Sequence, residues 1–289
     1  MTDVPAFPVL TKKEGRTAVP LAVWLAGAWI FLMVLVGIFA DQLRPYAVTA
    51  LDLSARLTPP AGLGGSLHHP LGTDELGRDV LSRLIQSIRI SLSISFGATI
   101  LGVLFGGLLG LMASHFRGLI EQCVLVLIDV QAALPFIILA LSTLAFFGNS
   151  LTLLIGLLAL YGWERHARIA RGLALSANTH GYMLAVRQLG ASPWRQYMRH
   201  LLPNISATMI VSATLAFPEI ILAESGLSFL GLGVQPPMTS LGNMVGYGRA
   251  YISSAPWILL FPSLIIVLTT LAISVAGDWM RDRFDPTIG

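Results

Sequence analysis

The sequence predicts an all-α membrane protein, a polytopic bundle of six transmembrane helices. Of its 289 residues, 55% are hydrophobic and only 11% are charged, whereas a soluble domain carries about a quarter charged residues. With so few charges, most of the surface must face lipid or other protein. Because each span needs about 20 apolar residues, the length suits one bundle of about six spans.

The N-terminal region consists of a polar tail, residues 1–19, and an uncharged apolar run, residues 20–40. A cleaved signal peptide would have a shorter apolar core of about 7–15 residues. We therefore interpret the run as a retained first span. Residues 41–89 are mixed in character and contain prolines and glycines, so we expect them outside the membrane.

The other five spans are expected within residues 90–280, which we interpret as one transmembrane domain. They are placed at residues 90–113, 122–147, 150–162 (continuing as helix through Arg171), 206–225 and 254–276. A loop is expected at residues 226–251, and a charged tail at 281–289.

Lysine and arginine set the expected orientation, because they are enriched in cytoplasmic segments. With the N-terminus inside, 12 of the 18 basic residues lie on the cytoplasmic side and six lie outside. This bias predicts two cytoplasmic termini and places residues 180–204 in the cytoplasm. It also accounts for the sequence pI of about 9.3, so we expect no nucleic-acid partner.

Small residues form a stripe in the second predicted span. Gly102, Gly106 and Gly110 recur every four residues and so share one helix face, on which a neighbouring helix can approach closely. Helix packing is the favoured interpretation, and a surface that slides during transport is the alternative.

Three acidic residues lie in or beside the predicted spans: Asp129, Glu219 and Glu224. Intramembrane acids are costly and usually face a bundle interior or an aqueous path. A translocation pathway is one interpretation, and a carboxylate hydrogen-bonded between helices or at the interface is the other.

No catalytic constellation is visible in the chain. Its lysines, Lys12 and Lys13, both lie in the N-terminal tail, so no P-loop lysine is available to hold nucleotide phosphates. The single cysteine, Cys123, permits no internal disulfide and no cysteine-only metal site. We expect no catalytic residue, metal or cofactor in this chain.

Residues 182–204 form a polar, arginine-bearing stretch between apolar segments. Tyr182, Ala185, Val186 and Leu189 have the i, i+3, i+4, i+7 spacing of one apolar helix face. Gly190 supplies a helix stop, and the following Ser-Pro pair at 192–193 is a helix start signal. The pattern predicts two short helices broken at Gly190, with Pro203 interrupting the helix before the next span. The apolar face must pack on the bundle, the membrane surface or a partner.

The same stretch resembles the EAA signature of ABC importer permeases, in which E-A-A is followed by a glycine and later by L-P. Ala185, Gly190, Leu202 and Pro203 match it strictly. Leu184 and Val186 depart from it, and Leu184 stands where members commonly carry glutamate.

Two further stretches resemble the C-type permeases of dipeptide, oligopeptide and nickel importers. They are HPLGTDELGRDVLSR at residues 69–83 and LSFLGLGVQPP at 227–237, the latter followed by related sequence as far as GDWMRDRFDP at 277–286. Asp129 and Pro135 also fit the subfamily pattern.

The resemblance implies a MetI-like type I importer fold in the bacterial inner membrane. It implies a heterodimer with a B-type permease, two cytoplasmic ATPase subunits that bind ATP and Mg²⁺, and a periplasmic solute-binding protein. Residues at the signature positions and beside them would contact an ATPase; these are Tyr182, Leu184, Ala185, Val186, Arg187, Gly190, Leu202 and Pro203. The cargo would be di- or oligopeptides or similar solutes. Alternatives are nickel chelates, glutathione, opines or oligosaccharides and, from another class, an autonomous channel or ion-coupled transporter.

Overall fold

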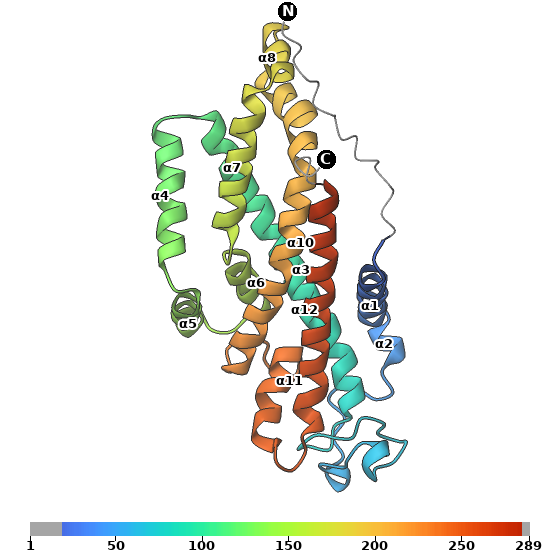
Figure 1. The fold of residues 1–289 in the computed structure, drawn as a ribbon. Coiled ribbons are helices and arrows are strands. Elements are labelled where there is room, and N and C mark those ends of the chain that lie inside the picture. Colours follow the sequence, from blue (N-terminus) through green and yellow to red (C-terminus); the bar gives the residue numbers. More distant parts are fainter. Residues whose placement is uncertain (1–18, 285–289) are drawn as a thin grey trace, which may run out of the picture.

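The computed structural model describes residues 19–284, which form an elongated bundle of helices (Figure 1). The predicted tail at residues 1–18 and the final residues, 285–289, lie outside the described part. The helices are α1 (Leu21–Ile38), α2 (Ala40–Leu43), α3 (Val80–His115), α4 (Leu119–Ala133), α5 (Phe136–Phe147), α6 (Leu151–Ala159), α7 (Trp163–Thr179), α8 (Gly181–Gln188), α9 (Pro193–Arg195), α10 (Leu202–Phe229), α11 (Leu241–Gly248) and α12 (Trp257–Phe284).

Four helices among the described residues are long and apolar enough to cross a membrane. They begin at Leu21, Val80, Pro193 and Trp257, and the pair α4–α5 makes a fifth candidate if it is counted as one broken span. The predicted class, an all-α membrane bundle, is confirmed.

The third predicted span is not one continuous helix. Its two halves, α4 and α5, meet at an angle of 91°. Leu134, between them, is extended, with ψ of 125°, because a residue before proline is disfavoured in the helical region. Pro135 then caps α5. The span predicted over residues 122–147 is therefore divided into two helices at Leu134–Pro135.

The fourth predicted span is also divided. The chain leaves α6 at Leu160 and begins α7 at Trp163, after Gly162 adopts a positive φ of 93°. Glycine tolerates this left-handed conformation because it has no Cβ. The expected continuous helix from residue 150 through Arg171 is thus replaced by two helices, of which α6 has only nine residues.

Pro203 does not interrupt the helix as expected. The chain stays helical from Pro193 to Phe229 through a π-helical turn, η3 (Gln196–Leu201). The N–H of Leu202 bonds the Tyr197 carbonyl five residues back. This wider turn immediately precedes Pro203, which occupies the start of α10, where a missing N–H costs little.

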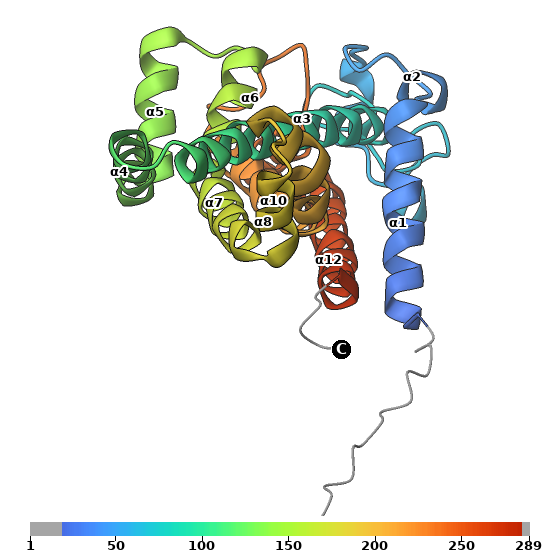
Figure 2. The same ribbon diagram turned by 90° about the horizontal axis from the view of Figure 1, so that it is seen from above.

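The long helix α3 runs through the whole bundle, and α1 stands at its periphery (Figures 1 and 2). The 36 residues of α3 extend about 54 Å, and α3 packs against α1, α6, α7 and α10. It begins ten residues before the predicted span because the Asp79 side chain accepts the N–H of Ser82 and caps the helix there.

The glycine stripe lies on the backbone of the α6–α7 region. A Cβ at Gly102 would come within 2.9 Å of the Ala159 carbonyl oxygen, and one at Gly106 within 2.2 Å of the Trp163 oxygen. At Gly110 the corresponding distance, to an α7 carbonyl, is 2.3 Å. No larger side chain fits these positions unless the two helices separate.

We predict that Gly106→Ala destabilises the chain by about 1–3 kcal/mol, because the added methyl overlaps backbone that cannot rotate away. The measurement is the thermal unfolding of the purified complex in detergent. Gly156→Ala, in α6, is the matched control because nothing lies within 4 Å of its Cβ position. Equal melting temperatures for Gly106→Ala and this control would contradict the prediction.

Candidate functional site

Residues 182–204, the polar stretch between apolar segments, form a compact cap at one end of the bundle, where α8 is labelled in Figure 1. As predicted, a helix ends near Gly190, whose φ is +74°. Its N–H bonds the Arg187 carbonyl at 3.0 Å. The next helix has Ser192 as its N-cap residue and Pro193 in its first turn. This confirms the helix start predicted from the Ser-Pro pair.

Hydrogen bonds attach this cap to the bundle. Arg187 donates to the Asn178 side chain of α7 at 2.8 Å and to Gln196 of η3 at 3.3 Å. Asn204 of α10 donates to the Tyr182 hydroxyl at 3.1 Å. Sequence reasoning missed Asn178, Gln196 and Asn204, since nothing in their spacing shows that separate helices meet here.

The cap buries one apolar side chain and exposes several others. Met183 is fully buried. Leu184, Leu189 and Trp194 are 48%, 87% and 72% exposed. In the predicted apolar face, Val186 is half-buried while Tyr182 and Ala185 are exposed. Leu202 packs with Leu201 and Ile205, and Pro203 is exposed.

Two of the three candidate pathway acids pair with arginines of α7. Asp129 of α4 lies 3.1 Å from Arg168, and Glu219 of α10 lies 2.7 Å from Arg165. The next arginine along the helix, Arg171, pairs with an acid of α4, Glu121. Arginines three residues apart on α7 thus bind two of its neighbouring helices, α4 and α10, a pattern that sequence reasoning did not identify.

Glu224 is the one candidate acid fully enclosed in the bundle. It accepts hydrogen bonds from Ser228, one turn further along α10, at 2.7 Å and from Ser91 of α3 at 3.3 Å. Ser91 also accepts the N–H of Leu241, at the start of α11, at 3.0 Å. Glu224 therefore lies at a junction of three helices, whereas Asp129 and Glu219 lie in exposed ion pairs away from it.

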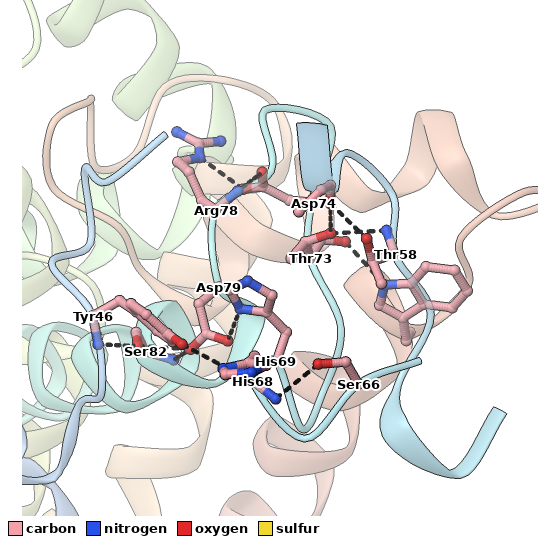
Figure 3. Close-up of polar contacts among 12 residues, drawn as sticks. Tyr46, Thr58, Ser66, His68, His69, Thr73, Asp74, Arg78, Asp79 and Ser82 are labelled. Carbon is pink, nitrogen blue, oxygen red and sulfur yellow. Dashed lines mark hydrogen bonds and ion pairs between the residues drawn. The ribbon is translucent and has the colours of Figure 1, made fainter. Parts of the chain in front are cut away.

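At the opposite end, the HPLGTDELGRD stretch folds into a hydrogen-bonded turn around two buried aspartates (Figure 3). Asp79 accepts the N–H and hydroxyl of Ser82, both at 2.7 Å, and lies 3.0 Å from the His69 Nδ1. The Tyr46 ring packs against His69 with 5.1 Å between centroids. The backbone N–H of Tyr46 donates to the Ser82 hydroxyl at 3.0 Å.

Asp74 organises the other half of this turn. It accepts the N–H groups of Leu76 and Arg78 at 2.9 Å and the Arg78 Nε at 2.7 Å. It also pairs with the buried Arg83 of α3. The neighbouring Thr73 carbonyl accepts the indole N–H of Trp257 at 3.1 Å, which ties the turn to α12.

The two subfamily stretches meet in space although some 150 residues separate them. Just beyond the end of each stretch, the hydroxyl oxygens of Ser87 and Thr239 lie 3.0 Å apart. A cavity of about 560 Å³ lies between the stretches and is lined by residues of both, among them Arg78, Arg83, Pro236 and Pro237. Within residues 19–284, no group of three or more His, Cys, Asp or Glu side chains is arranged to hold a metal.

Comparison with known proteins identifies the family. The model of the binding-protein-dependent transport system inner membrane component matches residues 102–289. The chain is 37% identical over 265 residues to the di/tripeptide transport system permease protein DppC of Pseudomonas aeruginosa, covering 91% of this chain and 88% of that protein. It is 34% identical to the glutathione transport system permease protein GsiD of Pectobacterium atrosepticum, covering 91% and 86%. The oligopeptide transport system permease protein OppC of Mycobacterium tuberculosis is 33% identical, with coverage of 88% and 87%.

A solved structure shows the same fold. The chain matches the MetNI methionine ABC transporter in an inward-facing conformation with a TM-score of 0.60 and 21% identity, covering 71% of this chain and 98% of that one. This match confirms the MetI-like fold. The chain therefore belongs to the family of binding-protein-dependent transport system inner membrane components, and it is a multi-pass permease subunit of an ABC importer rather than an enzyme.

Proposed function

We propose that this chain is the C-type permease of an ATP-driven importer and forms half of a translocation pathway for di- or oligopeptides or peptide-like solutes. The permeases it resembles are named for transport of di/tripeptides, dipeptides and oligopeptides. Glutathione is the second candidate, because a relative with nearly the same coverage is named for it and it is itself a peptide-like molecule.

The observation that carries this proposal is the cap made by α8, Gly190 and α9. The Arg187 side chain ties it to Asn178 of α7, while Leu184, Leu189 and Trp194 remain exposed. Exposed apolar clusters on an ordered element are typical of protein docking surfaces. We propose that this cap enters a cleft of an ATPase subunit. Leu184 in place of the usual glutamate indicates an apolar joint at this position.

In the proposed complex, the chain pairs with a B-type permease above two cytoplasmic ATPases that bind ATP and Mg²⁺. A periplasmic solute-binding protein delivers the cargo. The chain crosses the membrane six times, with α4–α5 and α6–α7 as the two broken crossings, and both termini lie in the cytoplasm. Residues 41–89 then lie on the periplasmic side. Closure of the ATPases would push the cap and shift the bundle between inward- and outward-facing states.

The direct test is reconstitution of the chain with its partner permease, ATPases and binding protein in proteoliposomes. We expect ATP-dependent accumulation of a labelled dipeptide, with unlabelled tripeptide and glutathione as competitors that rank the cargo. Accumulation that persists without ATPase subunits would instead support an autonomous transporter.

We predict that Gly190→Pro abolishes ATP-coupled uptake while the chain still reaches the membrane. Proline cannot adopt the positive φ of this position, and it removes the N–H that bonds Arg187. Uptake is compared at matched levels of bound ATPase. Gly172→Ala, in α7 where no atom lies within 4 Å of the new Cβ, is the control. Normal uptake by Gly190→Pro would exclude the coupling role.

We predict that Glu224→Gln changes transport more than assembly. The amide fits the same space and can still accept the Ser228 hydrogen bond, but it removes a carboxyl group from the junction of α3, α10 and α11. Assembly is measured by co-purification and transport by peptide uptake. Glu219→Gln, in an exposed ion pair, should cost at most about 1 kcal/mol of stability. Lost assembly with normal uptake by the residual Glu224→Gln complex would make Glu224 structural.

A further inference from the structure

An apolar groove of about 670 Å³ runs between the peripheral helix α1 and the helices α3, α10 and α12. Its lining is mostly hydrophobic and includes Ile30 and Val34 of α1, Leu92, Ser93 and Phe96 of α3, and Phe217 of α10. On α3 the lining extends from Arg89 to Phe96, which is about 10 Å along the helix axis. Figure 2 shows α1 at the edge of the bundle, where it packs against α3 and α12.

Two contacts fix the distance of α1 from the helices behind it. In the middle of α1, Trp29 donates its indole N–H to Thr269 of α12 at 3.2 Å. Near the end of α1, the missing side chain of Gly37 lets the helix approach the Arg89 backbone, since a Cβ there would lie 3.7 Å from the Arg89 Cα. The groove is therefore part of the fold and is not closed by the side chains around it.

A positively charged cluster lies at the end of the groove where α1 stops. Asp41 of α2 pairs with Arg89 at 2.6 Å and with Arg44 at 3.0 Å. The hydrogen bond from Arg89 lowers the pKa of the Asp41 carboxyl, so Asp41 is ionised at neutral pH. Among residues 19–284, Asp41 is the only acid within ion-pair distance of either guanidinium.

Two guanidinium groups and one carboxylate leave this cluster with a net charge of +1. Each arginine carries five N–H donors in a planar fork, and each uses only part of that fork on Asp41. All three side chains are between 32% and 51% exposed. The remaining donors match a phosphate group, which arginine binds through paired hydrogen bonds.

We propose that this groove binds an anionic phospholipid, with one acyl chain between α1 and α3 and the phosphate on Arg89 and Arg44. The arrangement of the lining residues supports this assignment. An apolar channel ends in a cationic cluster just where the span α1 ends, at the level of the lipid headgroups. A transmembrane helix of a partner would have to bring a second acid to this point to satisfy the same charges. A phospholipid provides both parts in one molecule.

The test uses the assembled transporter, purified and transferred to nanodiscs of phosphatidylcholine containing phosphatidylglycerol. Retained phosphatidylglycerol is counted by native mass spectrometry after detergent exchange. Arg89→Gln removes the headgroup contact, and Ser93→Phe fills the apolar channel without changing any charge. Arg56→Gln is the matched control, an exposed arginine in the same 41–89 segment.

We expect phosphatidylglycerol to be retained in preference to phosphatidylcholine by the native complex. Arg89→Gln should weaken retention about fivefold, as expected for the loss of one arginine near a membrane surface, and Ser93→Phe should abolish it. Arg56→Gln should behave like the native complex, and inorganic phosphate should not displace the lipid, because phosphate lacks the acyl chain.

Three results would overturn the proposal. These are equal retention of both lipids by the native complex, displacement by inorganic phosphate alone, and a cryo-EM map in which a helix of the partner permease fills the groove. The first two need no variant, so a folding defect in Ser93→Phe would not obscure the answer. The outcome is independent of the cargo, since lipid retention is measured without transport.

Discussion

The close approach of α3 to the α6–α7 region is the contact on which the rest of the bundle depends. Gly102, Gly106 and Gly110 remove side chains from one face of α3 and let it lie directly on backbone carbonyls. Because lipid tails offer no hydrophobic force that favours one helix over another, such close packing is a main source of helix association in membranes. With α3 fixed there, its remaining faces receive α1, α4, α10 and α11.

Polar groups then determine how the other helices are placed against this pair. The arginines of α7 pair with acids of α4 and α10. These ion pairs hold the two mostly apolar helices α4 and α10 on either side of the charged helix α7. Glu224 joins α10 to α3 through Ser91, and the same serine fixes the start of α11. Groups buried away from water must find partners within the protein, and Glu224 finds one on its own helix and one on α3.

Helix α10 connects the two ends of the molecule. It follows directly from the π-helical turn beside the cap, and its 28 residues extend about 42 Å. Near its far end it carries Glu224 and Ser228, and the segment that follows α10 shares a cavity with the HPLGTDELGRD turn. A displacement of the cap would therefore reach the opposite end of the bundle through one helix and the serine contacts around Glu224. This geometry is consistent with the proposed coupling to an ATPase.

The sequence alone was sufficient for the class, the family resemblance, the glycine stripe and the helix break at Gly190, because each rests on local chemistry or on composition. It could not show that Leu134–Pro135 turns the chain by 91° or that Pro203 is carried through a π-helical turn. Proline limits backbone angles, but neighbouring helices decide whether a kink, a break or a wider turn results. Only the tertiary structure placed Asp129 and Glu219 beside arginines, enclosed Glu224 among serines, and set Arg89 at the end of an apolar groove. These pairings join residues far apart in the chain, and no spacing within one segment records which helices will meet.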